Sequence, residues 1–275
     1  MREKEIERWN NKISISIIIT IVFIFIGVTN MNAAGFLEFG DSTSWKEEVL
    51  LHNGSKIIVE RSQSYGGNHE INQTPPVKEH SIKFALPGTN KVIKWQDEFS
   101  HEIGRSNFIL LALHIIDDTP YIITTPRLCL SYNKWGRPNP PYVIFKYENK
   151  EWKRIELSEL PVEFKNINVV IETKGEEKEL LRQGLVSAEK VKELNSSLKQ
   201  PEFKTILRTP IKIWCEEMIR VKDGWYGIDW FSNQPSSEEC LNFCKQKNVD
   251  AQNCPCDRLF KSKTKGKGVK SPLGS

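Results

Sequence analysis

Residues 49–61 read VLLHNGSKIIVER, and this stretch sets the fold class of the chain. Two runs rich in Val, Leu and Ile flank Asn53-Gly54. An Asn-Gly pair is the strongest short hairpin signal, because both turn positions tolerate a positive φ. The pattern therefore predicts two antiparallel strands, Val49–His52 and Lys56–Arg61, joined by a tight turn.

The same signal recurs further along the chain. Three more pairs of short apolar runs flank turn-forming residues: Ile82–Leu86 with Val92–Trp95, Leu110–Ile116 with Tyr121–Thr125, and Val143–Tyr147 with Trp152–Leu157. No long helical pattern lies between Trp45 and Thr173. This spacing predicts a mainly β domain over residues 36–173, built as an antiparallel sandwich or a barrel-like sheet.

The composition changes after residue 173, where KGEEK at 174–178 is expected to be a charged connector. Ser187 is placed to cap a helix, with Val186 packing onto Val191. A second short helix is expected from Pro201 to Leu207, and a hairpin from Met218–Lys222 and Trp225–Trp230. Residues 174–260 are therefore expected to form a small α/β part with a Cys-rich helical motif.

Six cysteines follow the N-terminal segment, and four of them cluster near the C-terminus. Ser236-Ser237-Glu238-Glu239 predicts a capped helix to about Lys247, which places Cys240 and Cys244 on one helical face. Cys254-Pro255-Cys256 is expected to return in a non-helical segment. The simplest arrangement is a pair of nested disulfides, one joining Cys244 to Cys254 and the other joining Cys240 to Cys256.

Two cysteines, Cys129 and Cys215, are then left to join the β region to the C-terminal part. Disulfides are favoured because an even cysteine count is typical of exported proteins. A C-x3-C-x9-C-x-C zinc site and a redox-active site are the alternatives. No cofactor is predicted.

The N-terminal segment predicts export. Residues 13–28, ISISIIITIVFIFIGV, are apolar on every side, four basic residues precede them, and the next Lys or Arg is Lys46. The N-terminus is therefore expected in the cytoplasm, with the remainder outside. Residues 1–35 form either a single-pass membrane anchor or a signal peptide that is cleaved after Gly35, and both alternatives stay open. The expected location is the bacterial envelope, either anchored to the inner membrane or periplasmic or secreted.

The C-terminal residues are strongly basic. From Arg258 to Ser275 the chain holds six bases and no acid, and residues 261–275 are expected to be a disordered, solubilising tail. Contact with anionic lipid or nucleic acid is the alternative, but no specific nucleic-acid site is predicted.

Residues 135–142, WGRPNPPY, are the candidate binding segment. The prolines hold the backbone extended, so Trp135, Arg137 and Tyr142 could present stacking and cationic contacts to a protein or glycan. The alternative is a rigid crossover loop whose Trp and Tyr fill the core of the sheet.

The same region carries a resemblance. YNKWGRPNPPYVIFKY, with LLALHI before it and DWF, CL, C and CPC after it, resembles a group of uncharacterised bacterial exported proteins that share the W-G-R-P-N-P-P-Y core. The resemblance covers most of the chain after the N-terminal segment. It implies an origin in the bacterial envelope and no particular activity.

Enzyme motifs give little support for catalysis. Ser187-Ala-Glu-Lys190 matches S-x-x-K, but the S-D-N and K-T-G elements that accompany it in penicillin-binding proteins and their relatives are absent from the sequence. The function favoured is a binding or structural module of the envelope. The alternative is a hydrolase or metal-dependent enzyme with a site assembled from distant residues such as His80, His101 and Glu102.

Overall fold

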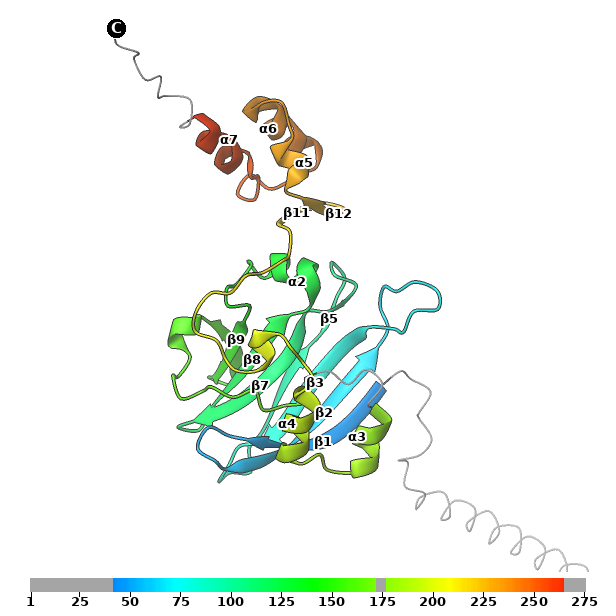
Figure 1. Ribbon diagram of the computed structural model, residues 1–275, viewed down its shortest axis with the longest axis vertical. Coiled ribbons are helices and arrows are strands. Elements are labelled where there is room, and N and C mark those ends of the chain that lie inside the picture. Colours follow the sequence, from blue (N-terminus) through cyan, green and yellow to red (C-terminus); the bar gives the residue numbers. More distant parts are fainter. Residues whose placement is uncertain (1–41, 172–176, 265–275) are drawn as a thin grey trace, which may run out of the picture. The chain divides into compact units, whose positions relative to one another are not determined.

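Two antiparallel sheets of four strands each form the larger part of the structure (Figure 1), a computed structural model that describes residues 42–171 and 177–264. One sheet has the order β1-β2-β3-β4 and the other the order β10-β9-β8-β7. Their bounds are Ser42–Leu50 (β1), Lys56–Tyr65 (β2), Val77–Ala85 (β3), Val92–Asp97 (β4), Phe108–Ile116 (β7), Thr119–Pro126 (β8), Val143–Glu148 (β9) and Glu151–Ile155 (β10). The prediction of a mainly antiparallel β fold is confirmed.

All four hairpins expected from the first part of the sequence are present. In the first of them, Leu50 pairs with Lys56, and Gly54 at the turn has a φ of +84°. The side chain of Asn53 accepts a hydrogen bond of 3.0 Å from the backbone N–H of Ser55, which closes the turn locally. Local turn chemistry therefore determines which strands are neighbours.

The two sheets share one apolar core. Alternate residues of a strand point to the same face, so one face of each strand can be apolar throughout. The first sheet contributes Val49, Val59 and Ile82 to the cluster, and the second contributes Leu110, Ile122 and Val143, all with 1% exposure or less. Burial of these side chains is the main force that holds the body of the protein together.

The other face of the second sheet is covered by the chain that follows it. Leu111, Ile123 and Ile144 point to this face and pack against a set of residues from the covering segment: Leu160, Phe164, Ile171 and Ile206. A 3-10 turn, Pro201–Phe203, replaces the longer helix expected from Pro201 to Leu207. Strands β7 and β8 of the second sheet are therefore buried on both faces.

Two helices, α3 (Glu177–Gln183) and α4 (Ala188–Asn195), pack beside β1. The side chain of Ser187 accepts a hydrogen bond of 3.2 Å from the N–H of Lys190, and Val186 and Val191 are buried in one cluster, as the sequence predicts. The predicted end of the charged connector, Lys178, is wrong, because α3 already begins at Glu177.

A buried ion pair lies beneath the same cluster. Arg61 and Glu47 are 1% and 0% exposed, and the Arg61 Nη1 atom donates to Glu47 Oε1 at 2.9 Å. Trp45 Nε1 donates to the other carboxylate oxygen at 2.8 Å. The two charges are tolerated in the interior because each is paired and hydrogen-bonded.

Sequence reasoning missed α2 (Leu128–Lys134), which follows β8. No side chain caps its first turn, and Leu128 at its start is 62% exposed. The helix is held by tertiary contacts instead, including a hydrogen bond from Ser131 Oγ to the carbonyl of Asn107. Such contacts leave no periodic signal in the sequence.

The C-terminal part contains β11 (Met218–Val221), β12 (Gly224–Gly227), α5 (Asp229–Ser232), α6 (Ser237–Gln246) and α7 (Cys256–Thr264). Ser236 caps α6 through the N–H of Glu239, as expected. The return after α6 is non-helical up to Pro255, as expected, but the expectation is wrong at Cys256, which opens α7. Pro255 lacks only an N–H that a first helical turn does not use, and its carbonyl accepts from Leu259. The disordered tail expected from residue 261 is wrong for residues 261–264, which continue α7.

The chain divides into two units, Met1–Asp41 and Ser42–Ser275. The predicted membrane segment 13–28, the cleavage position at Gly35 and the rest of the basic tail lie outside the described residues. Within the ranges that are described, no helix has both the length and the apolar character needed to cross a membrane.

Candidate functional site

A cleft of about 560 Å³ is the candidate functional site. Its walls come from the turn that holds Glu102, the end of α2, the β11-β12 hairpin and the segment that leads into α7. The lining residues are Glu102, Asn133, Lys134, Glu217, Met218, Ile219, Arg220, Trp225, Gln252, Asn253, Cys254, Pro255, Asp257 and Arg258. The cleft thus brings together segments that are far apart in the sequence.

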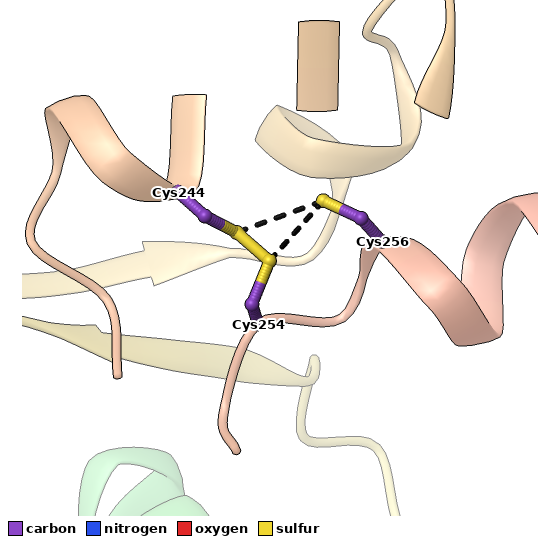
Figure 2. Close-up of side chains that lie close together, drawn as sticks. All are labelled: Cys244, Cys254 and Cys256. Atoms are coloured by element: carbon purple, nitrogen blue, oxygen red, sulfur yellow. Dashed lines mark hydrogen bonds between the residues drawn. A yellow bond between two sulfur atoms is a disulfide. The ribbon is translucent and has the colours of Figure 1, made fainter. Parts of the chain in front are cut away.

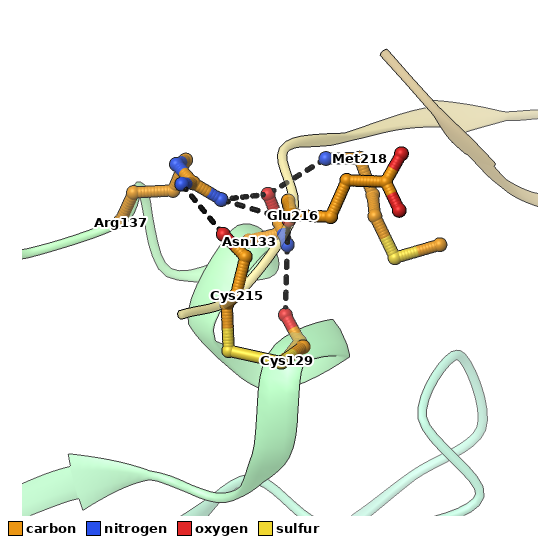
Figure 3. The surroundings of a disulfide bond; sticks show 6 residues. All are labelled: Cys129, Asn133, Arg137, Cys215, Glu216 and Met218. Carbon is orange, nitrogen blue, oxygen red and sulfur yellow. Dashed lines mark hydrogen bonds between the residues drawn. A yellow bond between two sulfur atoms is a disulfide. The ribbon is translucent and has the colours of Figure 1, made fainter. Parts of the chain in front are cut away.

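One disulfide joins the two sides of this site (Figure 3). Cys129 on α2 bonds to Cys215, across 86 residues of sequence. Beside it, the Asn133 side chain donates to the carbonyl of Glu216 at 2.9 Å and accepts from the N–H of Met218 at 2.9 Å. The segment that enters β11 is therefore held by a covalent bond and by a side-chain amide that binds its backbone on both sides.

Arg137 strengthens the same junction. Its Nη1 atom donates to the carbonyl of Glu216 at 2.9 Å, and its Nη2 atom donates to the carbonyl of Cys215 at 3.0 Å. The guanidinium also lies over the ring of Tyr132, 5.1 Å from its centroid. Several donors in fixed geometry are what a guanidinium supplies best, so Arg137 fixes backbone carbonyls inside the protein.

Glu102 carries the charge network at one end of the cleft. Its carboxylate lies 3.2 Å from Lys134 Nζ and 3.1 Å from Arg220 Nε. Burial by itself would raise the pKa of this carboxyl, but the hydrogen bonds and charges of Lys134 and Arg220 prevail and lower it. Glu102 is therefore ionised at neutral pH and joins α2 to β11.

Arg258 forms the second charged contact, from the start of α7. It donates two hydrogen bonds to the carboxylate of Glu217, one of them 3.0 Å long between Nη1 and Oε2. The hydrogen bond to Glu217 raises the pKa of Arg258. Counted over the whole lining, Glu102, Glu217 and Asp257 balance Lys134, Arg220 and Arg258. The cleft is highly charged and electrically neutral.

Trp225 supplies the aromatic wall. The Arg220 guanidinium lies 5.7 Å from its ring centroid, and Arg220 Nη1 also donates to the carbonyl of Gly224 at 2.7 Å. The indole Nε1 is buried and has no hydrogen-bond partner among the described residues. Buried polar groups are normally hydrogen-bonded, so this indole N–H is an exception among the groups that line the cleft.

Two further disulfides lie next to the cleft, and Figure 2 shows one of them, between Cys244 and Cys254, beside the sulfur of Cys256. Cys240 bonds to Cys256 and Cys244 bonds to Cys254, which is the nested arrangement expected from the spacing. All six cysteines are in disulfides, and the prediction of disulfide bonds is confirmed. Cys254 is half-buried and lines the cleft, whereas Cys240, Cys244 and Cys256 are buried in the core of the C-terminal part.

Trp135, the first of the predicted binding residues, packs against the core shared by the two sheets. Its ring centroid lies 4.6 Å from that of Phe108, and its Nε1 atom donates to Asn107 Oδ1 at 3.3 Å. Arg154 lies over the ring, 5.7 Å from the centroid. The structure thus gives Trp135 internal partners.

Tyr142, another predicted binding residue, is only 5% exposed. Its hydroxyl donates toward the carbonyl of Thr205 at 3.1 Å and accepts from the N–H of Leu207 at 3.1 Å. Burial, the largest effect, raises the pKa of Tyr142 to about 12. Trp135 and Tyr142 therefore have internal partners, as in the crossover-loop alternative, and Arg137 supports the segment that enters β11. A role of these residues in ligand contact stays a prediction.

The residues considered for a metal site have separate environments. His80 is buried, with its Nε2 atom 3.3 Å from Asp97 Oδ2 and 3.0 Å from the carbonyl of Phe108. His101 is exposed and packs on Phe99, while Glu102 binds Lys134 and Arg220. Within the described part of the chain, the one cluster with metal-ligand spacing is Cys244, Cys254 and Cys256, whose sulfurs are in disulfides.

Comparison of the chain with protein-family models, with curated proteins and with solved structures gave no match. The resemblance to bacterial exported proteins stays a prediction.

Sequence reasoning did not find the cleft. Glu102, Arg220 and Arg258 are single charged residues in three separate segments. The fold brings Arg220 to Glu102 and Arg258 to Glu217. The available signal was Cys129 with Cys215, since a disulfide between these positions brings α2 next to the start of β11.

Proposed function

We propose that this chain is an extracytoplasmic binding module, and that its cleft holds a segment of a partner polypeptide. The supporting observation is the neutral set of three acidic and three basic side chains that lines the cleft. A polypeptide offers backbone donors and acceptors together with side chains of both signs, so it can replace these internal ion pairs one by one. Nucleic acid or anionic lipid would instead favour an excess of bases.

Placement outside the cytoplasm rests on two features. All six cysteines form disulfides, which persist in oxidising compartments. The apolar residues 13–28, with basic residues before them, suit an N-in, C-out segment. The chain is accordingly proposed to act in a bacterial envelope, as a single-pass anchored protein or, if cleaved near Gly35, as a periplasmic or secreted one.

The test is selection from a library of displayed random peptides against the purified region that follows residue 35, with its disulfides intact. The proposal predicts enriched peptides that share a charge pattern. Arg220→Ala should weaken their binding about tenfold or more, because arginines in partly buried interfaces contribute on the order of 1–2 kcal/mol.

Lys83→Ala is the matched control, since Lys83 forms a surface ion pair with Glu60 on the first sheet, away from the cleft residues. It should leave peptide affinity unchanged. Equal melting temperatures of the two variants would show that Arg220→Ala does not act by unfolding. Enriched peptides that bind both variants equally would place the binding surface elsewhere and refute the proposal.

A further inference from the structure

The two C-terminal disulfides are in van der Waals contact. Cys254 Sγ lies 3.4 Å from Cys256 Sγ, and Cys244 Sγ lies 3.6 Å from the same atom (Figure 2). The sulfurs of Cys244, Cys254 and Cys256 all lie within 4.8 Å of one another. A thiolate formed on any of these residues would therefore have a second disulfide within reach.

Cys254 is the most exposed of the four cysteines in these two disulfides. Cys254 is half-buried and lines the cleft, whereas Cys240, Cys244 and Cys256 are 0%, 3% and 0% exposed. Thiol–disulfide exchange requires an attacking thiolate to reach a disulfide sulfur. Of this cluster, Cys254 is the sulfur that a thiol can reach through the cleft.

Charged groups of both signs surround the approach to Cys254. Lys134, Arg220 and Arg258 line the cleft, and three acidic side chains balance them, so the lining has no net charge. Arg258 is the more exposed member of its ion pair, with 58% side-chain exposure against 29% for Glu217, so its guanidinium can also contact an incoming thiolate. Burial opposes charge on the inner sulfurs, so exchange between them depends on their close approach.

We propose that the cleft is a thiol–disulfide exchange site. An external thiolate attacks Cys254 Sγ, forms a mixed disulfide with it and breaks the bond to Cys244, whose sulfur leaves with the electron pair. The Cys244 thiolate then attacks Cys256 Sγ, forms a Cys244–Cys256 disulfide and leaves a thiolate on Cys240. These two steps are redox-neutral, because each forms one S–S bond and breaks one.

A substrate that carries two thiols takes the reaction further. Its second thiolate attacks the substrate sulfur of the mixed disulfide, closes a substrate disulfide and releases the thiolate of Cys254. The substrate loses two electrons, and the protein gains them as the thiols of Cys240 and Cys254. Dithiols, including cysteine pairs of polypeptides, are the substrate class.

Cys129–Cys215 is the internal comparison. Cys129 is exposed, so an external thiol reaches this disulfide as well. Among the described residues, the cysteine cluster consists of Cys244, Cys254 and Cys256 and does not include this pair. Attack there leads to an adduct or to reduction, whereas attack at Cys254 also leads to a new cysteine pairing.

The experiment treats the native protein with graded reduced glutathione, stops exchange with acid, alkylates the free thiols and maps the disulfides by mass spectrometry. The expected map shows a glutathione adduct on Cys254 in more than about tenfold excess over Cys244, because attack is limited by access. It also shows a new Cys244–Cys256 peptide that grows with the adduct. An adduct without that peptide, or one that is equally frequent on Cys244, overturns the proposal.

Two variants test whether the cations of the cleft speed up the attack on Cys254. Arg258→Ala should slow formation of the Cys254 adduct, whereas Lys83→Ala should not; equal rates in both would refute the role of the cleft cations. A second arm replaces glutathione with a peptide that carries two cysteines and should yield the oxidised peptide. Glutathione alone tests the exchange, so failure of peptide binding and failure of exchange are distinguishable.

Discussion

The two-sheet body and the C-terminal part are stabilised in different ways. The body buries a continuous apolar core between and behind its sheets. The C-terminal part has a small cluster, in which three of the five buried residues are cysteines. A small apolar core supplies little free energy, so covalent links replace it there. The proposed thiol–disulfide exchange therefore involves the same disulfides that stabilise the C-terminal part.

The largest expected effect falls on the body. Glu47→Ala should lower the free energy of unfolding by about 4 kcal/mol, because it leaves the buried charge of Arg61 without its partner. Denaturant unfolding measures the loss, and hydrogen exchange should locate it in β1 and β2. Glu60→Ala is the matched control: Glu60 on β2 forms an exposed pair with Lys83, so the loss should stay below about 1 kcal/mol. Equal losses would contradict the difference between a buried and a surface pair.

The reverse experiment targets the C-terminal part. Replacing both Cys240 and Cys256 with Ser should cost about 3 kcal/mol there, from the unfolded-state entropy of a loop with a sequence separation of 16. Hydrogen exchange should speed up in α6 and α7 and stay slow in the strands of the body. Faster exchange in β7 and β8 as well would show that the two regions unfold together.

Low pH is expected to lower the folding stability of the two-sheet body. Burial chiefly lowers the pKa of His114 to about 4, and the nearby His52 lowers it further, against a hydrogen bond to the carbonyl of Asn166 that raises it. In the unfolded chain the imidazole of His114 is protonated below pH 6.5, whereas in the folded protein it is protonated only below about pH 4. The contribution of neutral His114 is thus fully present above pH 6.5 and is lost as the pH falls, by about 3 kcal/mol at pH 4.

The measurement is denaturant unfolding of wild type, His114→Gln and His101→Asn at about pH 7.5 and about pH 4. Since the other groups titrate alike in each protein, the stability gap between wild type and His114→Gln should narrow in acid. The gap to His101→Asn, which lacks an exposed side chain, should not change. If the difference in unfolding free energy between wild type and His114→Gln did not change with pH, burial of His114 would not contribute to the acid sensitivity of the protein.

The smallest expected effect compares two helix caps. Ser187 caps α4 beside the body and Ser236 caps α6 in the C-terminal part. Replacement of either by Ala should cost about 1 kcal/mol. Reduction of the disulfides should abolish protection of α6 from hydrogen exchange in Ser236→Ala before it does so in wild type, while α4 in Ser187→Ala should not respond to reductant. A response of α4 would mean that the body also depends on the disulfides.

Sequence reasoning predicted the features that depend on local chemistry. Asn53-Gly54 predicted a hairpin, Ser187 and Ser236 predicted the starts of two helices, and the cysteine spacing indicated disulfides. It missed α2, whose first turn has no side-chain cap, and it missed α7, because Cys256 was expected to lie in a non-helical return and residues from 261 onward in a disordered tail. The cleft depends on pairs such as Glu102 with Arg220, separated by 118 residues, and no local pattern encodes such a pair.

The disulfide between Cys129 and Cys215 also closes a covalent ring in the chain, with 86 residues of separation between its ends. A protease that makes one cut inside this ring does not separate the N-terminal and C-terminal fragments, since the S–S bond still joins them. Such a nicked molecule would migrate as one band on a non-reducing gel and as two bands after reduction. Wherever the protein meets a protease, the bond therefore provides a tolerance of backbone cleavage that is independent of folding stability.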